Sequence, residues 1–476
     1  MAEISGELMR LRTLEQEKFA NTKETNPNAV TRQENVDPKA LLTLVGIRIS
    51  ENPIPGYIRL YNQDFIVEEI GLDEKVSTIE PELSFSPVAN SPTIYVDLVK
   101  YGMGTIEAVT QLANALKLPV EKVQYAGLKD GRALTSQKIS IRGLQGGLVE
   151  TPVLTHAFIK AVQSGKGAMA QGTLKGNRFT IFVRTKDGTD NAELEKKIHE
   201  IEKDGFANFY GVQRFGNRLS NPLLGKLLCQ NNVAEATKIF LVNSGPLDLP
   251  LYVDIRERAN AVYGKWSEML KVFDEFPYSF RHERAVVSSL VGFPDDYKKA
   301  ISTISDQVKF WIYGYASYLV NELLSKAAAG EVDLPTPLPL PLGGDFKSDK
   351  LYQERLLEDK TDNYNMYLRQ FPFLINKPRS IEPWIMPEVH SLFFVPEGVI
   401  ISFSLPKGVY ATTFLTAIFE IFDSAPIPTW VRRTMVDIKA TLEIGSVQDS
   451  LGYLKVDISE KTISDTVSVD VNFSGE

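Results

Sequence analysis

The order of secondary-structure patterns along the chain is the feature that most limits its fold. From Gly46 onward, short β-rich runs follow one another, among them YIRLY, DFIVEEI, TIYVDLVKY, VLTHAFIKAV and RFTIFVRTK. After Asn217 the sequence becomes helix-rich, and from about Val395 a strand pattern returns in GVIISFSL. Strands interrupted by a long helical stretch are typical of an α+β domain that contains a helical insertion. We therefore expect an α+β fold.

Three helices are predicted from apolar spacing and end signals. Apolar residues at i, i+4, i+7 and i+11 predict a helix over 306–328. A second helix is expected over 190–204, with Asp190 or Asn191 as N-cap and Gly205 at its end. A third is expected to begin with Thr105 as N-cap.

The segments VQYAGLK and ALTSQKISIR are expected to be two strands that flank the dipeptide Asp130–Gly131. Asp-Gly between two strand patterns is a strong signal for a tight hairpin turn. Taken alone, this aspartate would be interpreted as a turn former.

Composition excludes several classes of site. The chain of 476 residues has one cysteine and four histidines without ligand spacing, so no disulfide and no metal site is expected. The P-loop, GxSxG, HExxH and kinase patterns do not occur, which argues against most NTPases, hydrolases, zinc proteases and kinases. No apolar run is long enough to span a membrane, and the charged N-terminus does not resemble a targeting signal. A cytoplasmic protein is expected.

Charge is distributed unevenly along the chain. Its net charge is −8, yet residues 121–184 contain ten basic and three acidic residues. This stretch predicts either a local surface that binds phosphates or simply a solvated, strand-rich surface, and charge alone does not decide between them.

Six segments, in order, resemble the tRNA pseudouridine synthase D (TruD) family. The most specific is AGLKDGRALTSQ around Asp130, which is similar to the family pattern AGxKDxxAxTxQ. Others are LKGNRF around Asn177 and NFYGVQRFG around Arg214. Two departures are visible: Phe209–Tyr210 reverses the usual order, and Arg59 stands where the family often has lysine. The segments comprise residues 59–69, 100–109, 125–137, 174–179, 208–216 and 405–412.

The resemblance implies a pseudouridine-synthase catalytic domain, with a mixed, largely antiparallel sheet and flanking helices. We expect this domain to comprise residues 42–207 and 381–476, with an inserted, mainly helical TRUD domain at 208–380. Residues 1–41 are interpreted as a polar N-terminal extension.

The resemblance also implies a reaction, the isomerisation of uridine in tRNA to pseudouridine without a cofactor. Position 13 of the tRNA is the expected target, with position 35 as a further one. Breaking the C1′–N1 bond and rejoining the base through C5 needs one carboxylate near C1′. Asp130 is the expected catalytic residue, and cationic neighbours in sequence would favour its ionised form.

The remaining site residues are expected to bind substrate. Arg59 would pair with Asp130, Asn177 would bond near it or the base, and Phe179 would stack on the uracil. For each of these, a strand-surface, loop or core role is the alternative. Candidate phosphate contacts are Lys129, Arg132, Lys175 and Arg214. Phe65, Tyr210, Phe215 and Tyr410 are interpreted as core residues, and Glu68 and Glu69 as members of ion pairs.

Partners follow from this interpretation. We expect tRNA as substrate, a monomer, and neither a membrane nor a protein partner. The alternative is an inactive RNA-binding protein or chaperone of the same fold. An enzyme acting on another nucleotide substrate is a third possibility, which release of free uracil or dependence on a methyl donor would reveal.

Overall fold

The computed structural model describes residues 2–48, 53–82, 86–89, 91–344, 346–374, 378–423 and 425–456. These residues form two compact units, a sheet unit of 53–206 with 386–456 and a helical unit of 2–48 with 207–385. The predicted α+β class is confirmed. In the described part of the chain, no helix is both long and apolar enough to cross a membrane.

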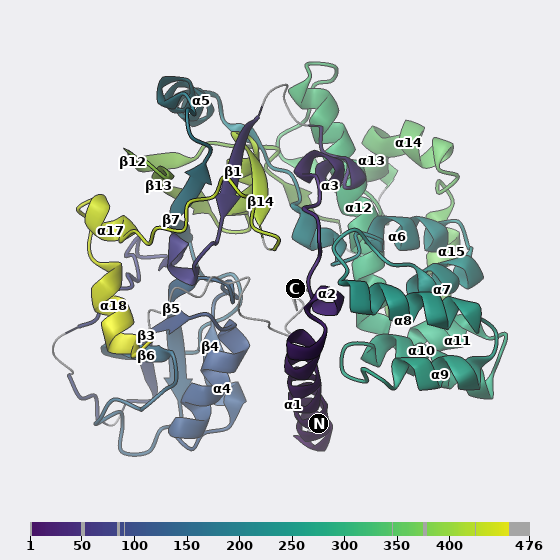
Figure 1. The fold of residues 1–476 in the computed structure, drawn as a ribbon, viewed down its shortest axis with the longest axis horizontal. Coiled ribbons are helices and arrows are strands. Elements are labelled where there is room, and N and C mark those ends of the chain that lie inside the picture. Colours follow the sequence, from purple (N-terminus) through teal and green to yellow (C-terminus); the bar gives the residue numbers. More distant parts are fainter. Residues whose placement is uncertain are drawn as a thin grey trace. The chain divides into compact units, whose positions relative to one another are not determined.

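The sheet unit contains a ten-stranded mixed sheet, as counted over the described residues (Figure 1). Its main path runs β12-β13-β7-β2-β5-β3-β6, while β1 pairs with β7 and β14, and β4 pairs with β5. The pairs β1–β14 and β2–β5 are parallel and the others are antiparallel. The strands are β1 (Ile54–Ile58), β2 (Phe65–Ile70), β3 (Thr93–Tyr101), β4 (Val123–Tyr125), β5 (Leu134–Arg142), β6 (Ala157–Gly165), β7 (Gly176–Thr185), β12 (Glu388–Val395), β13 (Gly398–Pro406) and β14 (Phe419–Asp423).

The two faces of this sheet have different covers. Side chains alternate between faces along a strand, so Ile66 and Glu68 of β2 lie on one face of the sheet, and Phe65 and Glu69 lie on the other. Ile66 packs in a core with the two helices α17 and α18, which Figure 1 shows beside the sheet. The other face, which carries Phe65, is covered at the β3 and β5 end by helix α4.

Of the two helices of the sheet unit that were predicted from end signals, one has the predicted ends and the other does not. The predicted helix at 190–204 is confirmed as α5, capped by the side chain of Asp190 and ended by Gly205 at φ +78°. The predicted N-cap of α4 was wrong: Gly104 is the N-cap and Thr105 is the first helical residue. The helices are α4 (Thr105–Ala115), α5 (Asn191–Asp204), α16 (Ala411–Thr416), α17 (Ile438–Thr441) and α18 (Val447–Leu454).

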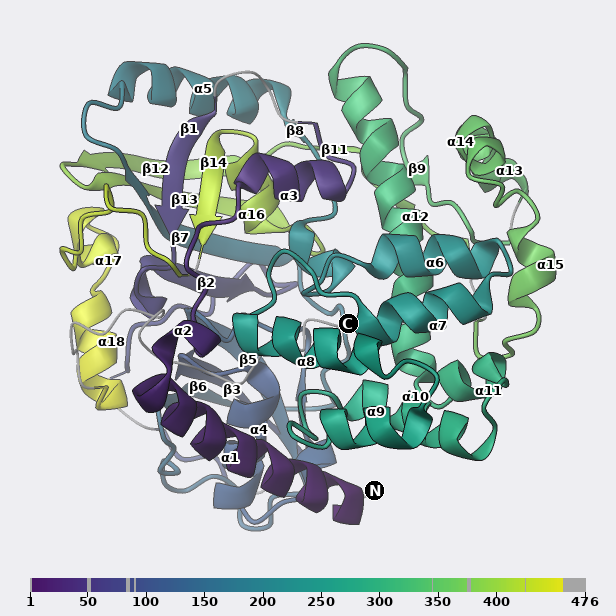
Figure 2. The ribbon, with the colours of Figure 1, turned by 45° about the vertical axis from the view of Figure 1, so that its right-hand side comes forward.

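The helical unit is a stack of mostly short helices, seen best in Figure 2. The chain enters it through β8 (Phe206–Ala207) and leaves it after β11 (Trp384–Ile385), and β9 (Leu338–Pro339) pairs with β10 (Ser380–Ile381). Its helices are α1 (Ala2–Thr25), α2 (Pro27–Val30), α3 (Pro38–Leu44), α6 (Asn221–Cys229), α7 (Val233–Val242), α8 (Pro250–Ala261), α9 (Trp266–Phe273), α10 (Arg281–Gly292), α11 (Tyr297–Ser302), α12 (Ser305–Ala328), α13 (Phe346–Asp349), α14 (Gln353–Glu358) and α15 (Tyr364–Leu368).

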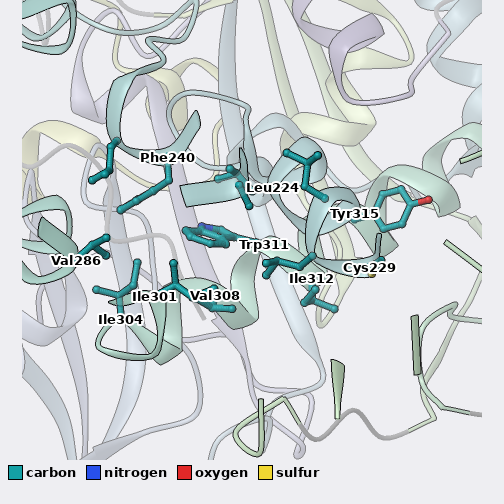
Figure 3. Packing of buried hydrophobic residues seen from close by; sticks show 14 of the residues in the cluster. Leu224, Cys229, Phe240, Val286, Ile301, Ile304, Val308, Trp311, Ile312 and Tyr315 are labelled. Carbon is teal, nitrogen blue, oxygen red and sulfur yellow. The ribbon is translucent and has the colours of Figure 1, made fainter. Parts of the chain in front are cut away.

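Helix α12 is the centre of this unit and confirms the predicted helix at 306–328. Its Trp311 is 1% exposed and lies among Leu224, Phe240 and Val308 in the core drawn in Figure 3. Helix α6 approaches α12 closely at Gly225, where an added Cβ would overlap the Trp311 carbonyl. Only a residue without a side chain fits there.

The N-terminal extension is a helix anchored to the same core. In α1, Phe19 is 2% exposed and its ring packs 6.5 Å from that of Tyr252. The buried carboxylate of Glu15 accepts hydrogen bonds from the Tyr278 and Ser279 backbone amides. The polar composition of this segment therefore conceals a docked helix.

Candidate active site

Asp130 lies in the connection 126–133 between β4 and β5. The two strands pair antiparallel, with Val123 opposite Ile141 and Tyr125 opposite Ile139. The predicted tight hairpin at Asp130–Gly131 was wrong, because that turn needs positive φ at both central residues and neither has it. The connection is instead a wider loop that exposes 45% of the Asp130 side chain.

Side chains from helix α4 and strand β5 hold this loop in place. The Thr105 hydroxyl of α4 accepts a hydrogen bond from the Lys129 backbone amide (2.8 Å) and donates one to Gln137 Oε1 (2.9 Å). The Gln137 amide in turn donates to the Gly127 carbonyl (2.8 Å). The Thr105 side chain thus forms its hydrogen bonds with the loop and with Gln137, and it does not cap its own helix.

Asp130 belongs to a cluster of two carboxylates and two guanidiniums. Arg59 Nη2 lies 3.7 Å from Asp130 Oδ2, and Arg59 Nη1 lies 3.0 Å from Asp423 Oδ2. The other oxygen of Asp423 accepts from Arg132 Nη2 at 2.7 Å. The structure therefore pairs Arg59 with Asp130, as the sequence suggested, and it adds Asp423, which is the carboxylate that Arg132 contacts.

Burial, backbone conformation and a ring contact hold the Arg59 side chain in this position, in addition to its charge. It is 6% exposed, has φ +56°, and its guanidinium carbon lies 4.1 Å from the centroid of the Phe65 ring. Burial lowers the pKa of Arg59, but attraction to Asp130 and Asp423 outweighs this and raises it. One planar fork contacts two carboxylates, which a lysine ammonium would do less well.

Asp423 is a partly buried carboxylate that its partners keep ionised. Burial raises its pKa, but the guanidiniums of Arg132 and Arg59 outweigh that effect and leave the pKa below its usual value. Because Asp423 compensates part of the Arg59 charge, Arg59 is not neutralised by Asp130 alone.

Asn177 and Phe179 lie on β7, on the same face of the sheet as Phe65. Phe179 stands opposite Phe403, and the two rings stack at 5.4 Å, while the Phe65 ring meets Phe179 edge-on at 6.3 Å. Phe179 is only 5% exposed, so little of its ring is open. The Asn177 Oδ1 atom is buried and, among the described residues, has no hydrogen-bond donor. An orphan buried acceptor is the arrangement that a bound base could satisfy.

The candidate phosphate contacts fall in different surroundings. Lys129 is buried, and its ammonium pairs with Glu69 at 2.8 Å, which favours a structural role. Lys175 is exposed and pairs with the exposed Glu74 at 2.7 Å. Arg214 belongs to the helical unit. Glu68 and Glu69 were predicted to form ion pairs, and both do.

Two residues of the site escaped the sequence reasoning. Asp423 ends β14 in FEIFD, which carries no motif. Lys100 is fully buried, and its ammonium donates to the carbonyls of Met103 and Asp130, each at 2.7 Å. Burial lowers the pKa of Lys100 to about 7, although the charge of Asp130 opposes this shift. Its place in the KYG segment, which is one of the six segments that resemble the family, was the available signal.

The arrangement supplies a half-exposed carboxylate, a buried cation beside it, and the Phe65 ring against that cation. Among the described residues, no three His, Cys, Asp or Glu side chains are placed to hold a metal ion. A carboxylate whose charge is compensated by a fixed arginine is suited to act as a nucleophile or a base.

Comparisons with known proteins agree with one another. The family model for tRNA pseudouridine synthase D (TruD) matches residues 47–363. A protein of Methanococcoides burtonii named "Probable tRNA pseudouridine synthase D" is 26% identical, covering 79% of this chain and 96% of its own. One of the same name from Methanopyrus kandleri is 27% identical over 75% and 92% of the two chains. The crystal structure of a TruD homologue from Methanosarcina mazei superposes with a TM-score of 0.59 at 22% identity, covering 80% of this chain and 98% of that one.

Proposed function

The chain belongs to the tRNA pseudouridine synthase D (TruD) family, and from this premise we propose that Asp130 is the residue that converts uridine in tRNA to pseudouridine. The protein is an RNA isomerase of the pseudouridine synthase class. The observation that carries the assignment to Asp130 is its half-exposed carboxylate, 3.7 Å from the buried guanidinium of Arg59, within the family motif.

The reaction is neutral overall and moves one bond. The C1′–N1 bond breaks, the uracil turns, C5 bonds to C1′, and the hydrogen at C5 leaves as a proton. Asp130 acts at the sugar, either by attacking C1′ or by taking the C2′ proton. Arg59 keeps the carboxylate oriented, with Asp423 holding the guanidinium from its other side.

The detached uracil needs a pocket that holds it in place. We assign this to Asn177, whose unsatisfied Oδ1 is suited to accept from the uracil N3–H, and to Phe179. Because Phe179 is 5% exposed and stacked on Phe403, its exposed edge forms an apolar floor. This assignment modifies the expected face-on stacking.

We further propose the domain division expected from the sequence, with residues 42–207 and 381–476 as the catalytic domain and residues 208–380 as the inserted TRUD domain. Position 13 of tRNA is the first target to test and position 35 the second. A cytoplasmic monomer is the expected state, which light scattering on a sizing column would check.

Release of tritium from tRNA transcripts labelled with [5-³H]uridine tests the proposed reaction. Bond formation at C5 expels that hydrogen, so the wild-type protein is expected to release one tritium per modified site. Chemical mapping of pseudouridine would then locate the site. Binding of the same RNA without release would support the alternative, an RNA-binding protein that lacks catalysis.

A further inference from the structure

A small cavity in the helical unit is lined by two tyrosines and two arginines. Its wall includes Tyr210, Arg214, Tyr313, Ser317 and Arg379, together with apolar residues of α12 and the 340–343 segment. The lining contains no aspartate and no glutamate. In a chain with a net charge of −8, such a cationic cavity needs an explanation.

The two arginines converge on one tyrosine ring. The guanidinium carbon of Arg214 lies 5.4 Å from the Tyr313 centroid and 5.5 Å from that of Tyr210. The guanidinium of Arg379 lies 5.6 Å from the same Tyr313 ring. Arg214 Nε donates one long hydrogen bond, 3.4 Å, to the Ser317 hydroxyl. Stacking occupies the faces of a guanidinium and leaves its N–H edges available to an acceptor.

Several other arginines of the helical unit are paired with carboxylates. The pairs include Arg218–Glu283, Arg256–Glu283, Arg258–Glu275, Arg284–Asp274 and Arg355–Glu322. Neither Arg214 nor Arg379 forms such a pair with any residue that the structure describes. Two guanidiniums without acids at one cavity are what an anion site requires.

We propose that this cavity binds a phosphate of the RNA substrate, through Arg214 and Arg379. Its accessible volume of about 40 Å³ is enough for the oxygens of one phosphate group. Contact with a phosphodiester orients RNA without reading its sequence. The identity of the ligand rests on the proposed function.

The variants Arg214→Gln and Arg379→Gln test this site, with Arg258→Gln as control because Arg258 is already paired with Glu275 on the surface of the same unit. Each cavity variant is expected to raise the dissociation constant for tRNA about tenfold. Each should also lower the slope of log K against log salt by about 1. The control should bind like the wild type.

Direct binding separates this inference from the proposed reaction. If the wild type binds tRNA but releases no tritium, cavity variants that weaken binding still support the phosphate site. Unchanged affinity and salt slope in both folded variants would overturn it. Protection of the cavity by inorganic phosphate, with RNA affinity untouched, would also overturn it by assigning a small anion instead.

A second, independent observation concerns Lys100. Its side chain is fully buried, and its ammonium donates to the carbonyls of Met103, Asp130 and, at 3.4 Å, Lys129. Charged groups that act on it are Asp130, Lys129 and Glu107. An ammonium has three N–H donors, so the protonated form alone satisfies all three carbonyls.

We infer that Lys100 is a positioning residue, which fixes the backbone of the catalytic loop in its protonated form. A neutral amine has two N–H donors for three carbonyls and leaves one buried carbonyl without a partner. Since the pKa of Lys100 is about 7, the loop is held below that pH and loosens above it. A displacement of the Asp130 carboxylate by about 1 Å lowers the rate about 100-fold.

Lys160→Met is the matched control for Lys100→Met. Lys160 is also buried, and its ammonium donates to the Glu80 carbonyl and the Thr78 hydroxyl. Both variants lose a buried ammonium and some stability, but only Lys100→Met is expected to lower kcat, by about 10- to 100-fold. Lys100→Arg, which keeps its charge at high pH, should remove the fall of kcat above pH 7.

Equal kcat and equal pH profiles in the two methionine variants would overturn the role of Lys100. If Lys100→Met does not fold, the wild-type profile decides, since a kcat that stays level from pH 6 to 9 contradicts the inference.

Discussion

Replacing Asp130 by alanine is expected to abolish tritium release from uridine-labelled tRNA, with a loss of at least about 10⁴-fold. In the proposed mechanism the Asp130 carboxylate acts at the sugar, and no second described carboxylate stands free in the cluster, because Asp423 is held by Arg59 and Arg132. Single-turnover assays with excess enzyme measure the loss.

The same substitution should hardly change stability or RNA affinity. The Asp130 side chain is 45% exposed, and Arg59 keeps its shorter contact with Asp423 when Asp130 is removed. We expect the free energy of unfolding to change by about 1 kcal/mol or less. Asp130→Asn, which keeps the shape and loses the charge, is the control for steric effects. Activity above one hundredth of wild type in either folded variant would contradict the assignment of Asp130.

Replacing Glu68 by alanine is expected to destabilise the protein by about 3–5 kcal/mol. Its side chain is fully buried on the other face of the sheet. Glu68 Oε2 accepts from Arg178 at 2.6 Å, and Oε1 accepts from Lys439 of α17 at 2.8 Å. Removing the carboxylate leaves Arg178 without its acid and leaves the fully buried Lys439 with Glu80 as its one remaining ion-pair partner among the described residues. Urea unfolding of the wild type and the variant measures the difference.

The ion-pair cluster of Glu68, Arg178 and Lys439 should also make the stability of the protein fall at acid pH. Burial raises the pKa of Glu68, but Lys439 and Arg178 outweigh it and lower the pKa below its ordinary value. A lowered pKa in the folded state contributes stability above the ordinary carboxyl pKa, and that contribution is lost as pH falls through the folded value. Glu74→Ala is the control, because Glu74 pairs with Lys175 at an exposed position. If Glu68→Ala and Glu74→Ala were equally stable, the proposed contribution of the Glu68 cluster to the free energy of unfolding would be contradicted.

Some features of the fold were readable because their causes are local. The apolar spacing of α12 and the Asp190 cap and Gly205 end of α5 depend on neighbours within one or two turns. The prediction of a tight turn at Asp130–Gly131 was wrong because residues distant in sequence hold this loop. The side chains of Thr105 and Lys100 form hydrogen bonds with its backbone. Local turn preference is weaker than several hydrogen bonds to a packed helix and strand.

The basic stretch 121–184 shows the same limit for charge. Many of its cations pair with carboxylates from other parts of the chain, as Lys129 does with Glu69 and Arg178 with Glu68. The two arginines for which we propose a phosphate contact lie outside that stretch, at 214 and 379. The net charge of a sequence segment therefore did not locate the two arginines that form no ion pair with a described carboxylate.

The sequence by itself determined the family and its pseudouridine synthase activity, and it supports the proposal that Asp130 is the reactive carboxylate, since these follow from residue types in ordered motifs around Asp130, Asn177 and Phe179. Tertiary structure alone decided the partners. It brought Asp423 to Arg59 across 364 positions, buried Lys100 against the 126–133 loop, and left Phe179 only 5% exposed and stacked on Phe403. The physical reason is that pairing and burial depend on distances in space. In a mixed sheet, those distances are set by strand order and register, which no local pattern encodes.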